Sequence, residues 1–126
     1  MYELTVAAEF EAAHLIPGYP GKCRRLHGHN WKVEIGVSGK KLNELGMLID
    51  FRDLKSEVAK IIERLDHTYL NENEYFPNLA PTAENLAKFI YDELAKGDLA
   101  MENVKLDFVE VWESPKSAVK YFPDKV

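Results

Sequence analysis

The chain has 126 residues, of which 46% are hydrophobic and 29% are charged, and its formal net charge is -5. This length and composition are typical of one soluble domain with an apolar core, so we expect a single domain over residues 1–126. The acidic balance argues against a nucleic-acid partner, and no apolar run approaches the roughly 20 residues that a membrane-spanning helix needs.

The chain opens with an alternating segment, residues 2–14. Apolar side chains such as Phe10 share one face with His14, while Glu9 and Glu11 fall on the other. A period of two predicts a half-buried strand. The segment carries acids and lacks a basic region, so we do not expect it to be a signal peptide.

A loop and a second strand follow. Residues 17–25 contain two prolines and two glycines, which predicts a loop. Residues 29–37 alternate again and predict a second strand. Residues 39–46 form a turn-rich connection after it.

Two amphipathic helices are predicted next. Apolar residues at helical spacing occupy positions 54–65, with Asp50 or Asp53 as the N-cap. The second helix begins near Thr82, another N-cap candidate, and Gly97 is well placed to end it.

Residues 66–81 between the helices are predicted to form a long loop, and residues 104–112 and 118–122 are predicted to form strands. The order ββααββ predicts an α+β domain, with an antiparallel four-stranded sheet and two helices on one face. An open sheet leaves edges that must be covered or paired with another subunit.

Three of the four histidines have spacings that suit a metal site. His27 and His29 are two residues apart, so both rings project from one face of a strand, and His14 ends the preceding strand. Imidazoles are preferred zinc ligands, and a catalytic zinc keeps three protein ligands and one open position. Surface or capping histidines are the alternative; the spacing favours Zn2+.

The only cysteine, Cys23, lies among Lys22, Arg24 and Arg25, four residues before His27. Nearby positive charge stabilises a thiolate, so Cys23 is a candidate reactive group beside the metal. The alternative is a buried, inert thiol. A single cysteine excludes an internal disulfide, which favours a reducing, cytoplasmic location.

Three other sites carry candidate acid–base or binding groups. Asp66 adjoins His67 and can orient it as a general acid–base, although such pairs also occur as caps at helix ends. Glu84 lies in the first turn of the second predicted helix, where an acidic side chain also complements the helix dipole. Glu113 is either a solvated strand end or a carboxylate that accepts two N–H bonds from a 2-amino-4-oxo heterocycle such as guanine or pterin.

Six segments, in this order, resemble the 6-pyruvoyl-tetrahydropterin synthase/6-carboxytetrahydropterin synthase family over essentially the whole chain. They are Phe10–His14, Cys23–Asn30, Gly46–Phe51, Leu65–His67, Pro81–Asn85 and Val111–Glu113. The resemblance implies the tunnelling fold, in which the sheets of ββααββ subunits join into a trimeric barrel. Two such barrels stack, which implies a homohexamer.

The resemblance also implies the site. Its residues fall into three groups, namely the metal ligands His14, His27 and His29, the catalytic Cys23, Asp66 and His67, and the substrate-binding Glu113, Thr82 and Glu84. Cys23 would be the catalytic base, and Asp66 with His67, supplied by a neighbouring subunit, would be the proton relay. Glu113 would anchor the pterin ring, with Thr82 and Glu84 lining the same pocket.

The spacing after the cysteine separates subfamilies. Three residues, Arg24–Leu26, lie between Cys23 and His-Gly-His. This is similar to the bacterial 6-carboxytetrahydropterin synthases of the queuosine (7-deazapurine) pathway, whereas animal-type 6-pyruvoyl synthases usually have five. A third subgroup, which cleaves dihydroneopterin, carries glutamate in place of the cysteine, so Cys23 argues against it.

The resemblance therefore implies a zinc-dependent lyase. It would convert 7,8-dihydroneopterin triphosphate to 6-carboxy-5,6,7,8-tetrahydropterin, acetaldehyde and triphosphate. One alternative is a 6-pyruvoyl-tetrahydropterin synthase, which eliminates triphosphate from the same substrate. The other is a non-catalytic protein with a structural zinc, which would normally be closed by four ligands.

Overall fold

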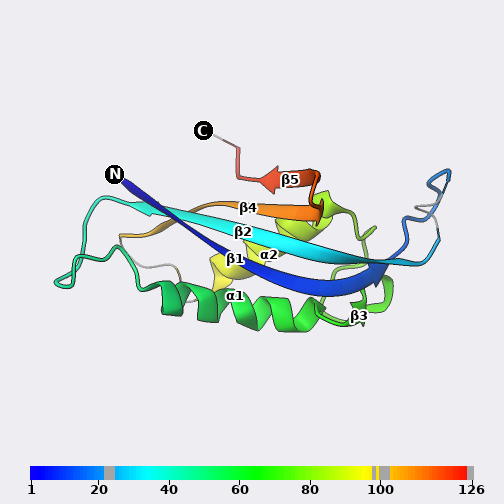
Figure 1. Cartoon of the computed structure of the whole chain (residues 1–126), viewed down its shortest axis with the longest axis horizontal. Helices are drawn as coiled ribbons and strands as arrows, with labels where there is room; N and C mark the ends of the chain where they lie inside the picture. The colour runs from blue at the N-terminus through cyan, green and yellow to red at the C-terminus, as the bar shows by residue number, and fades with distance from the viewer. Residues whose placement is uncertain (22–24, 98, 100–102, 125–126) are drawn as a thin grey trace.

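The computed structural model describes residues 1–21, 25–97, 99 and 103–124. The elements in chain order are β1 (Tyr2–His14), β2 (His27–Gly39), α1 (Phe51–Leu65), β3 (Thr68–Tyr69), the short 3-10 helix η2 (Leu70–Glu72), α2 (Ala83–Lys96), β4 (Lys105–Ser114) and β5 (Ser117–Tyr121). The strands form one sheet in the order β3-β1-β2-β4-β5. Both helices cover the same face of it (Figure 1), which confirms the predicted α+β class.

The long antiparallel pair β1 and β2 forms the centre of the sheet. Its register places His14 opposite His27 and Ala12 opposite His29. Directly opposed residues project to the same face of a sheet, so the three side chains share the face that the helices cover. On β1 this face is buried at Phe10 and His14, whereas Glu11 on the other face is exposed. The predicted alternation is confirmed.

Each helix begins where its cap was predicted. The Asp50 side chain accepts a hydrogen bond from the backbone N–H of Arg52, and α1 buries Leu54, Val58, Ile61, Ile62 and Leu65. The Thr82 side chain caps α2, and Gly97 ends it. These caps satisfy N–H groups that have no partner within the helix. No helix in the described part of the chain has the length and apolar character to cross a lipid bilayer.

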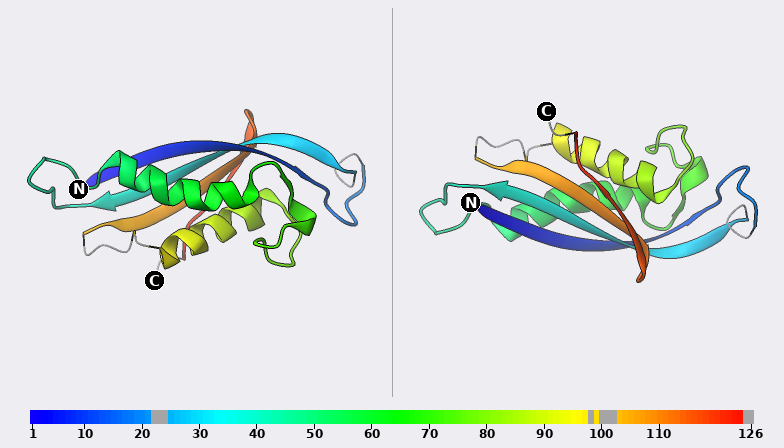
Figure 2. Two further views of the ribbon diagram at one scale, coloured as in Figure 1. Left: turned by 90° about the horizontal axis from the view of Figure 1, so that it is seen from below. Right: turned by 90° about the horizontal axis from the view of Figure 1, so that it is seen from above.

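The segment between the helices is more ordered than the expected loop. It contains η2 and the two-residue strand β3, which pairs in parallel with β1 at Ala12 and Ala13. The sheet thus has five strands, one more than the pattern indicated, because two residues are too short to show a period. In the two views of Figure 2, β1 runs along the outside of the sheet for most of its length.

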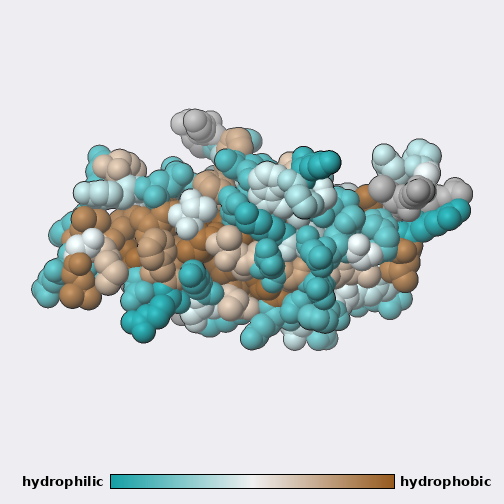
Figure 3. All heavy atoms as spheres, viewed as in Figure 1, coloured by the Kyte–Doolittle hydropathy of each residue, from teal (hydrophilic) through white to brown (hydrophobic). Residues whose placement is uncertain are grey.

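The outer edge of β1 is an exposed surface. Among the described residues, its only strand partner on that side is β3, which reaches Ala12 and Ala13 alone. Figure 3 shows apolar side chains gathered over the strands in the left half of the view, between two more polar margins. A strand edge of this kind is open to pairing or packing with a second chain.

Trp31 packs against the histidines at one end of the apolar core. Its side chain is fully buried, and its Nε1 donates to the carbonyl of Ala12 at 3.2 Å. Its ring meets His14 and His29 edge to face, with centroids 5.1 and 5.2 Å away. The apolar core therefore ends in an aromatic platform that holds two imidazoles.

We expect Trp31→Phe to lower the free energy of unfolding by about 1–3 kcal/mol, because it leaves the buried Ala12 carbonyl without its donor and a void beside it. Trp112→Phe is the matched control. Trp112 is only partly buried, and its Nε1 has no hydrogen-bond partner in the described residues. Denaturant titration of both variants measures the difference; an equal loss in the two would contradict the supporting role of Trp31.

Candidate metal centre and catalytic cleft

The three predicted metal ligands meet at one end of the sheet. The rings of His14, His27 and His29 have centroid separations of 4.5, 4.9 and 4.7 Å. Glu113, near the end of β4, joins them, and the four ligand atoms lie within 4.8 Å of one another. Glu113 Oε1 is 3.2 Å from His29 Nε2, an ion-pair distance, but the two atoms form no hydrogen bond. These four residues can hold a metal ion.

Backbone carbonyls orient two of the rings. The Nδ1 atom of His14 is 2.8 Å from the carbonyl oxygen of Pro81, and that of His27 is 2.6 Å from the carbonyl oxygen of Arg25. A carbonyl can only accept, so in each ring Nδ1 carries the proton and Nε2 presents a lone pair. Carbonyl partners of this kind are typical of metal-bound histidines.

Two of the ring nitrogens are free to bind a metal ion. The Nε2 atoms of His14 and His29 are buried and have no hydrogen-bond partner among the described residues. Leaving such an atom unsatisfied costs about 1–3 kcal/mol, so native structures seldom keep one without a reason. A metal ion at this point would satisfy both nitrogens, and the residues present therefore fit a metal.

Burial keeps two of these rings neutral. Desolvation is the main cause that lowers the pKa of His14, against the opposing hydrogen bond from Pro81. Desolvation also lowers the pKa of His29, against the opposing charge of Glu113. A histidine binds a metal only in its neutral form. The lowered pKa values therefore extend the pH range of metal binding downward.

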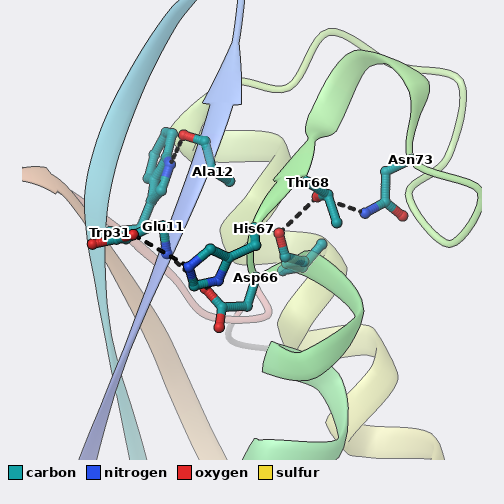
Figure 4. A network of polar contacts seen from close by, with 8 residues as sticks. Glu11, Ala12, Trp31, Asp66, His67, Thr68 and Asn73 are labelled. Carbon is teal, nitrogen blue, oxygen red and sulfur yellow. Dashed lines mark hydrogen bonds and ion pairs between the residues drawn. The ribbon is translucent and has the colours of Figure 1, made fainter.

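Asp66 and His67 form a second group. The two follow α1 directly, and Asp66 Oδ1 is 2.9 Å from His67 Nδ1. The backbone N–H of Glu11 also donates to Asp66 Oδ1, and this bond is the main cause that lowers the pKa of the Asp66 carboxyl. Figure 4 shows the His67 ring lying between Asp66 and β1.

The backbone at His67 is strained. Its φ is 57°, in the left-handed region, and it is the only described residue other than glycine with a positive φ. Such a conformation costs roughly 1–3 kcal/mol and often marks a functional site. A residue without a role here would be expected to be glycine or asparagine.

One open cleft of about 860 Å³ borders both groups. Its lining includes His29 and Glu113 from the metal group, and Asp66 and His67 from the second group. The structure thus brings together residues from β2, β4 and the turn after α1. His14 lies deeper, fully buried beneath this surface.

Thr82 and Glu84 lie at the start of α2 and are not among the residues that line this cleft. The Thr82 hydroxyl accepts from the backbone N–H of Asn85 at 3.2 Å, as expected of a cap. Glu84 is an exposed residue of the first turn. Their predicted contact with substrate stays a prediction. Cys23 lies outside the described residues.

Two contacts of the site were missed by sequence reasoning. The pattern placed Glu11 on the outward face of its strand and gave it no role, and it treated Glu113 as separate from the metal ligands. Glu11 and Asp66 are 55 positions apart in the chain. No local pattern in the sequence reports a contact over that separation.

Comparisons with known proteins are consistent along the whole chain. A profile of the family described as 6-pyruvoyl tetrahydropterin synthase matches residues 3–124. The 6-carboxy-5,6,7,8-tetrahydropterin synthase of Haemophilus influenzae is 33% identical over an alignment of 143 positions. This alignment covers 96% of this chain and 99% of that protein. The enzyme of the same name from Synechocystis is 37% identical over 122 residues, covering 93% and 90%.

Comparison with solved structures points to the same family. The structure of Caenorhabditis elegans 6-pyruvoyl tetrahydropterin synthase superposes with a TM-score of 0.82, covering 98% of this chain and 96% of that chain, at 25% identity. The expected fold, two helices on one face of a mainly antiparallel sheet, is therefore confirmed.

We expect His27→Ala to lower the bound metal per chain sharply, because it removes one of three imidazole ligands. His67→Ala is the matched control, since His67 lies outside the metal group and its loss should leave the metal in place. Elemental analysis after dialysis against a chelator measures both. Full metal content in His27→Ala would contradict the assignment. The same measurement on Glu113→Gln shows whether Glu113 is a ligand or only a neighbour.

Proposed function

Since the chain belongs to the 6-pyruvoyl tetrahydropterin synthase family, we propose that it is a zinc-dependent 6-carboxy-5,6,7,8-tetrahydropterin synthase. Its substrate would be 7,8-dihydroneopterin triphosphate, and its products 6-carboxytetrahydropterin, acetaldehyde and triphosphate. The reaction would serve the biosynthesis of queuosine and related 7-deazapurines. The names of the Haemophilus influenzae and Synechocystis relatives support this choice.

The observation that carries the proposal is the pairing of two kinds of group on one cleft. A set of three imidazoles lies at one side, and in the described part of the chain the Nε2 atoms of His14 and His29 have no hydrogen-bond partner. The hydrogen-bonded Asp66–His67 pair lies at the other. A carbon–carbon lyase needs both an electrophilic centre and a proton-transfer group.

We propose zinc as the metal, held by His14, His27 and His29. Imidazole nitrogen is a preferred zinc donor, whereas Mg2+ and Ca2+ prefer oxygen. When bound, the ion would acidify the substrate's side-chain hydroxyls and the adjacent C–H. The carbonyl contacts of His14 and His27 at Nδ1 leave Nε2 as the ligand atom of both rings.

Cys23 and His67 would transfer protons from and to the substrate. As a thiolate with Lys22, Arg24 and Arg25 as its neighbours in the sequence, Cys23 would take a proton from the substrate. Asp66 occupies Nδ1 of His67, so His67 would exchange a proton with substrate at Nε2. Asp66 therefore orients the ring and favours the tautomer in which Nε2 is reactive.

Glu113 would accept paired N–H bonds from the amide edge of the pterin ring. Its place on the cleft supports this role, and a carboxylate suits a bidentate contact. Thr82 and Glu84 would contact the same ring. The start of α2 is tied to the metal group through the bond between Pro81 and His14, which supports placing both residues near the substrate.

We propose that residues 1–126 act as one domain in a cytoplasmic homohexamer, built as two stacked trimers. The outer edge of β1, which in the described part of the chain pairs with β3 at Ala12 and Ala13 alone, supports association through the sheet. One chain places Asp66 and His67 on the same cleft as His29 and Glu113, whereas the family resemblance implies that the pair serves the site of a neighbouring subunit. Mixing of inactive variants distinguishes the two arrangements.

Two other functions have specific support. The Caenorhabditis elegans neighbour carries the name 6-pyruvoyl tetrahydropterin synthase, so triphosphate elimination without carbon–carbon cleavage is the nearest alternative. The second is a non-catalytic protein with a structural zinc. Glu113 within reach of three histidines would close such a site with a fourth ligand.

Incubation of the zinc-loaded protein with 7,8-dihydroneopterin triphosphate, with products identified by mass, tests the function directly. We expect 6-carboxytetrahydropterin and acetaldehyde. Cys23→Ala should keep its zinc and lose about 10²–10⁴-fold in turnover, the usual contribution of a general base. A 6-pyruvoyl product would favour the first alternative, and fully loaded protein without turnover would favour the second.

Mixing inactive variants tests the shared site. If one site uses Cys23 of one subunit and His67 of another, hexamers that contain both Cys23→Ala and His67→Ala chains should recover part of the activity. Subunit exchange is verified by native mass spectrometry. Exchange without any recovery would place both groups in one subunit.

A further inference from the structure

Glu11 contacts the Asp66–His67 pair at three points. Its backbone N–H donates to Asp66 Oδ1 at 2.9 Å, and its carbonyl accepts from the backbone N–H of His67 at 2.6 Å. Its side-chain Oε2 is 3.4 Å from His67 Nε2. Figure 4 shows these groups side by side. Two backbone contacts fix the turn, and the carboxylate contacts the ring itself.

The His67 ring is therefore held between two carboxylates. Asp66 Oδ1 lies 2.9 Å from Nδ1, and Glu11 Oε2 lies at ion-pair distance from Nε2. Neutral imidazole has a single N–H, and an ionised carboxylate can only accept. With the Nδ1 proton directed at Asp66, the contact of Nε2 with Glu11 is attractive only when a further proton lies between them.

This proton is in reach of water. The side chains of His67 and Glu11 are 73% and 64% exposed, and both line the cleft. The other titratable groups on the cleft are Glu9, His29, Lys32 and Glu113. In the described part of the chain, Asp66 and Glu11 are the carboxylates within ion-pair distance of the ring.

We propose that Glu11 is a positioning residue for proton transfer, which fixes the ring of His67 and shares the proton at Nε2. The inference rests on the proposed role of His67 as proton relay. When Nε2 gives its proton to the substrate, His67 becomes neutral and keeps the proton on Nδ1, which donates to the Asp66 carboxylate. A proton from water then restores the pair through the Glu11 carboxyl group.

Glu11→Gln isolates the carboxylate. It keeps the backbone contacts to Asp66 and His67 and the size of the side chain, but an amide cannot share the proton. Glu9→Gln is the matched control, because Glu9 lies two residues away on the same exposed face of β1 and, in the part of the chain that the structure describes, forms no ion pair with His67. Both variants remove one negative charge from the cleft.

The first readout is nitrogen NMR of histidine-labelled protein, with the His67 signals assigned by their loss in His67→Ala. We expect the Nε2 signal of His67 to shift in Glu11→Gln and to stay in place in Glu9→Gln. This measurement needs no turnover. An unchanged His67 signal in Glu11→Gln overturns the proposal, whether or not the protein has pterin synthase activity.

The second readout is turnover of dihydroneopterin triphosphate. We expect kcat of Glu11→Gln to fall about tenfold or more, within the range of acid–base effects. Added formate or imidazole buffer should restore part of it, and Glu11→Asp should retain more activity than Glu11→Gln. Full activity in Glu11→Gln overturns the positioning role. Wild-type protein without turnover would instead refute the proposed function, and the NMR result then decides the Glu11 contact alone.

Discussion

The register between β1 and β2 is the constraint on which the rest of this structure depends. A slip of one residue would turn every side chain of a strand to the opposite face. Fully or nearly buried residues such as Phe10 and Trp31 hold the register, because a slip would expose them and bury charged neighbours. The same register sets His14 opposite His27. The register that packs the core therefore also sets the geometry of the metal group.

The groups that cost stability gather at one end of this sheet. His14 and His29 each bury an unpartnered ring nitrogen, and His67 holds a left-handed backbone conformation. Each costs about 1–3 kcal/mol, while both helices follow ordinary rules of capping and burial and the Oδ2 atom of Asp107, near the start of β4, is the one buried carboxylate oxygen without a hydrogen-bond partner among the described residues. Costs that are concentrated in this way are typical of a functional site, where a geometry is retained although it lowers the stability of the fold.

The two halves of the cleft differ in their contact with water, and this difference suits different work. In the metal group His14 is fully buried and His29 is partly buried, and desolvation lowers the pKa of both rings, which favours binding of a cation by the neutral imidazoles. The Asp66–His67 pair is exposed to solvent, which favours exchange of protons with water. Backbone contacts join each half to a distant element: Pro81 ahead of α2 orients His14, and Glu11 on β1 holds Asp66.

The sequence by itself determined what depends on neighbours along the chain. Period-two alternation predicted β1 and β2, helical spacing predicted the buried side of α1, and Asp50, Thr82 and Gly97 predicted helix ends, because each of these signals spans only a few residues. The spacing of His27 and His29 likewise predicted a shared face. Only the tertiary structure decided that Glu113 joins the histidines, that β3 pairs with β1, and that Glu11 contacts His67. Those contacts join residues more than 50 positions apart, and they depend on strand order and on the register that burial of the whole core selects.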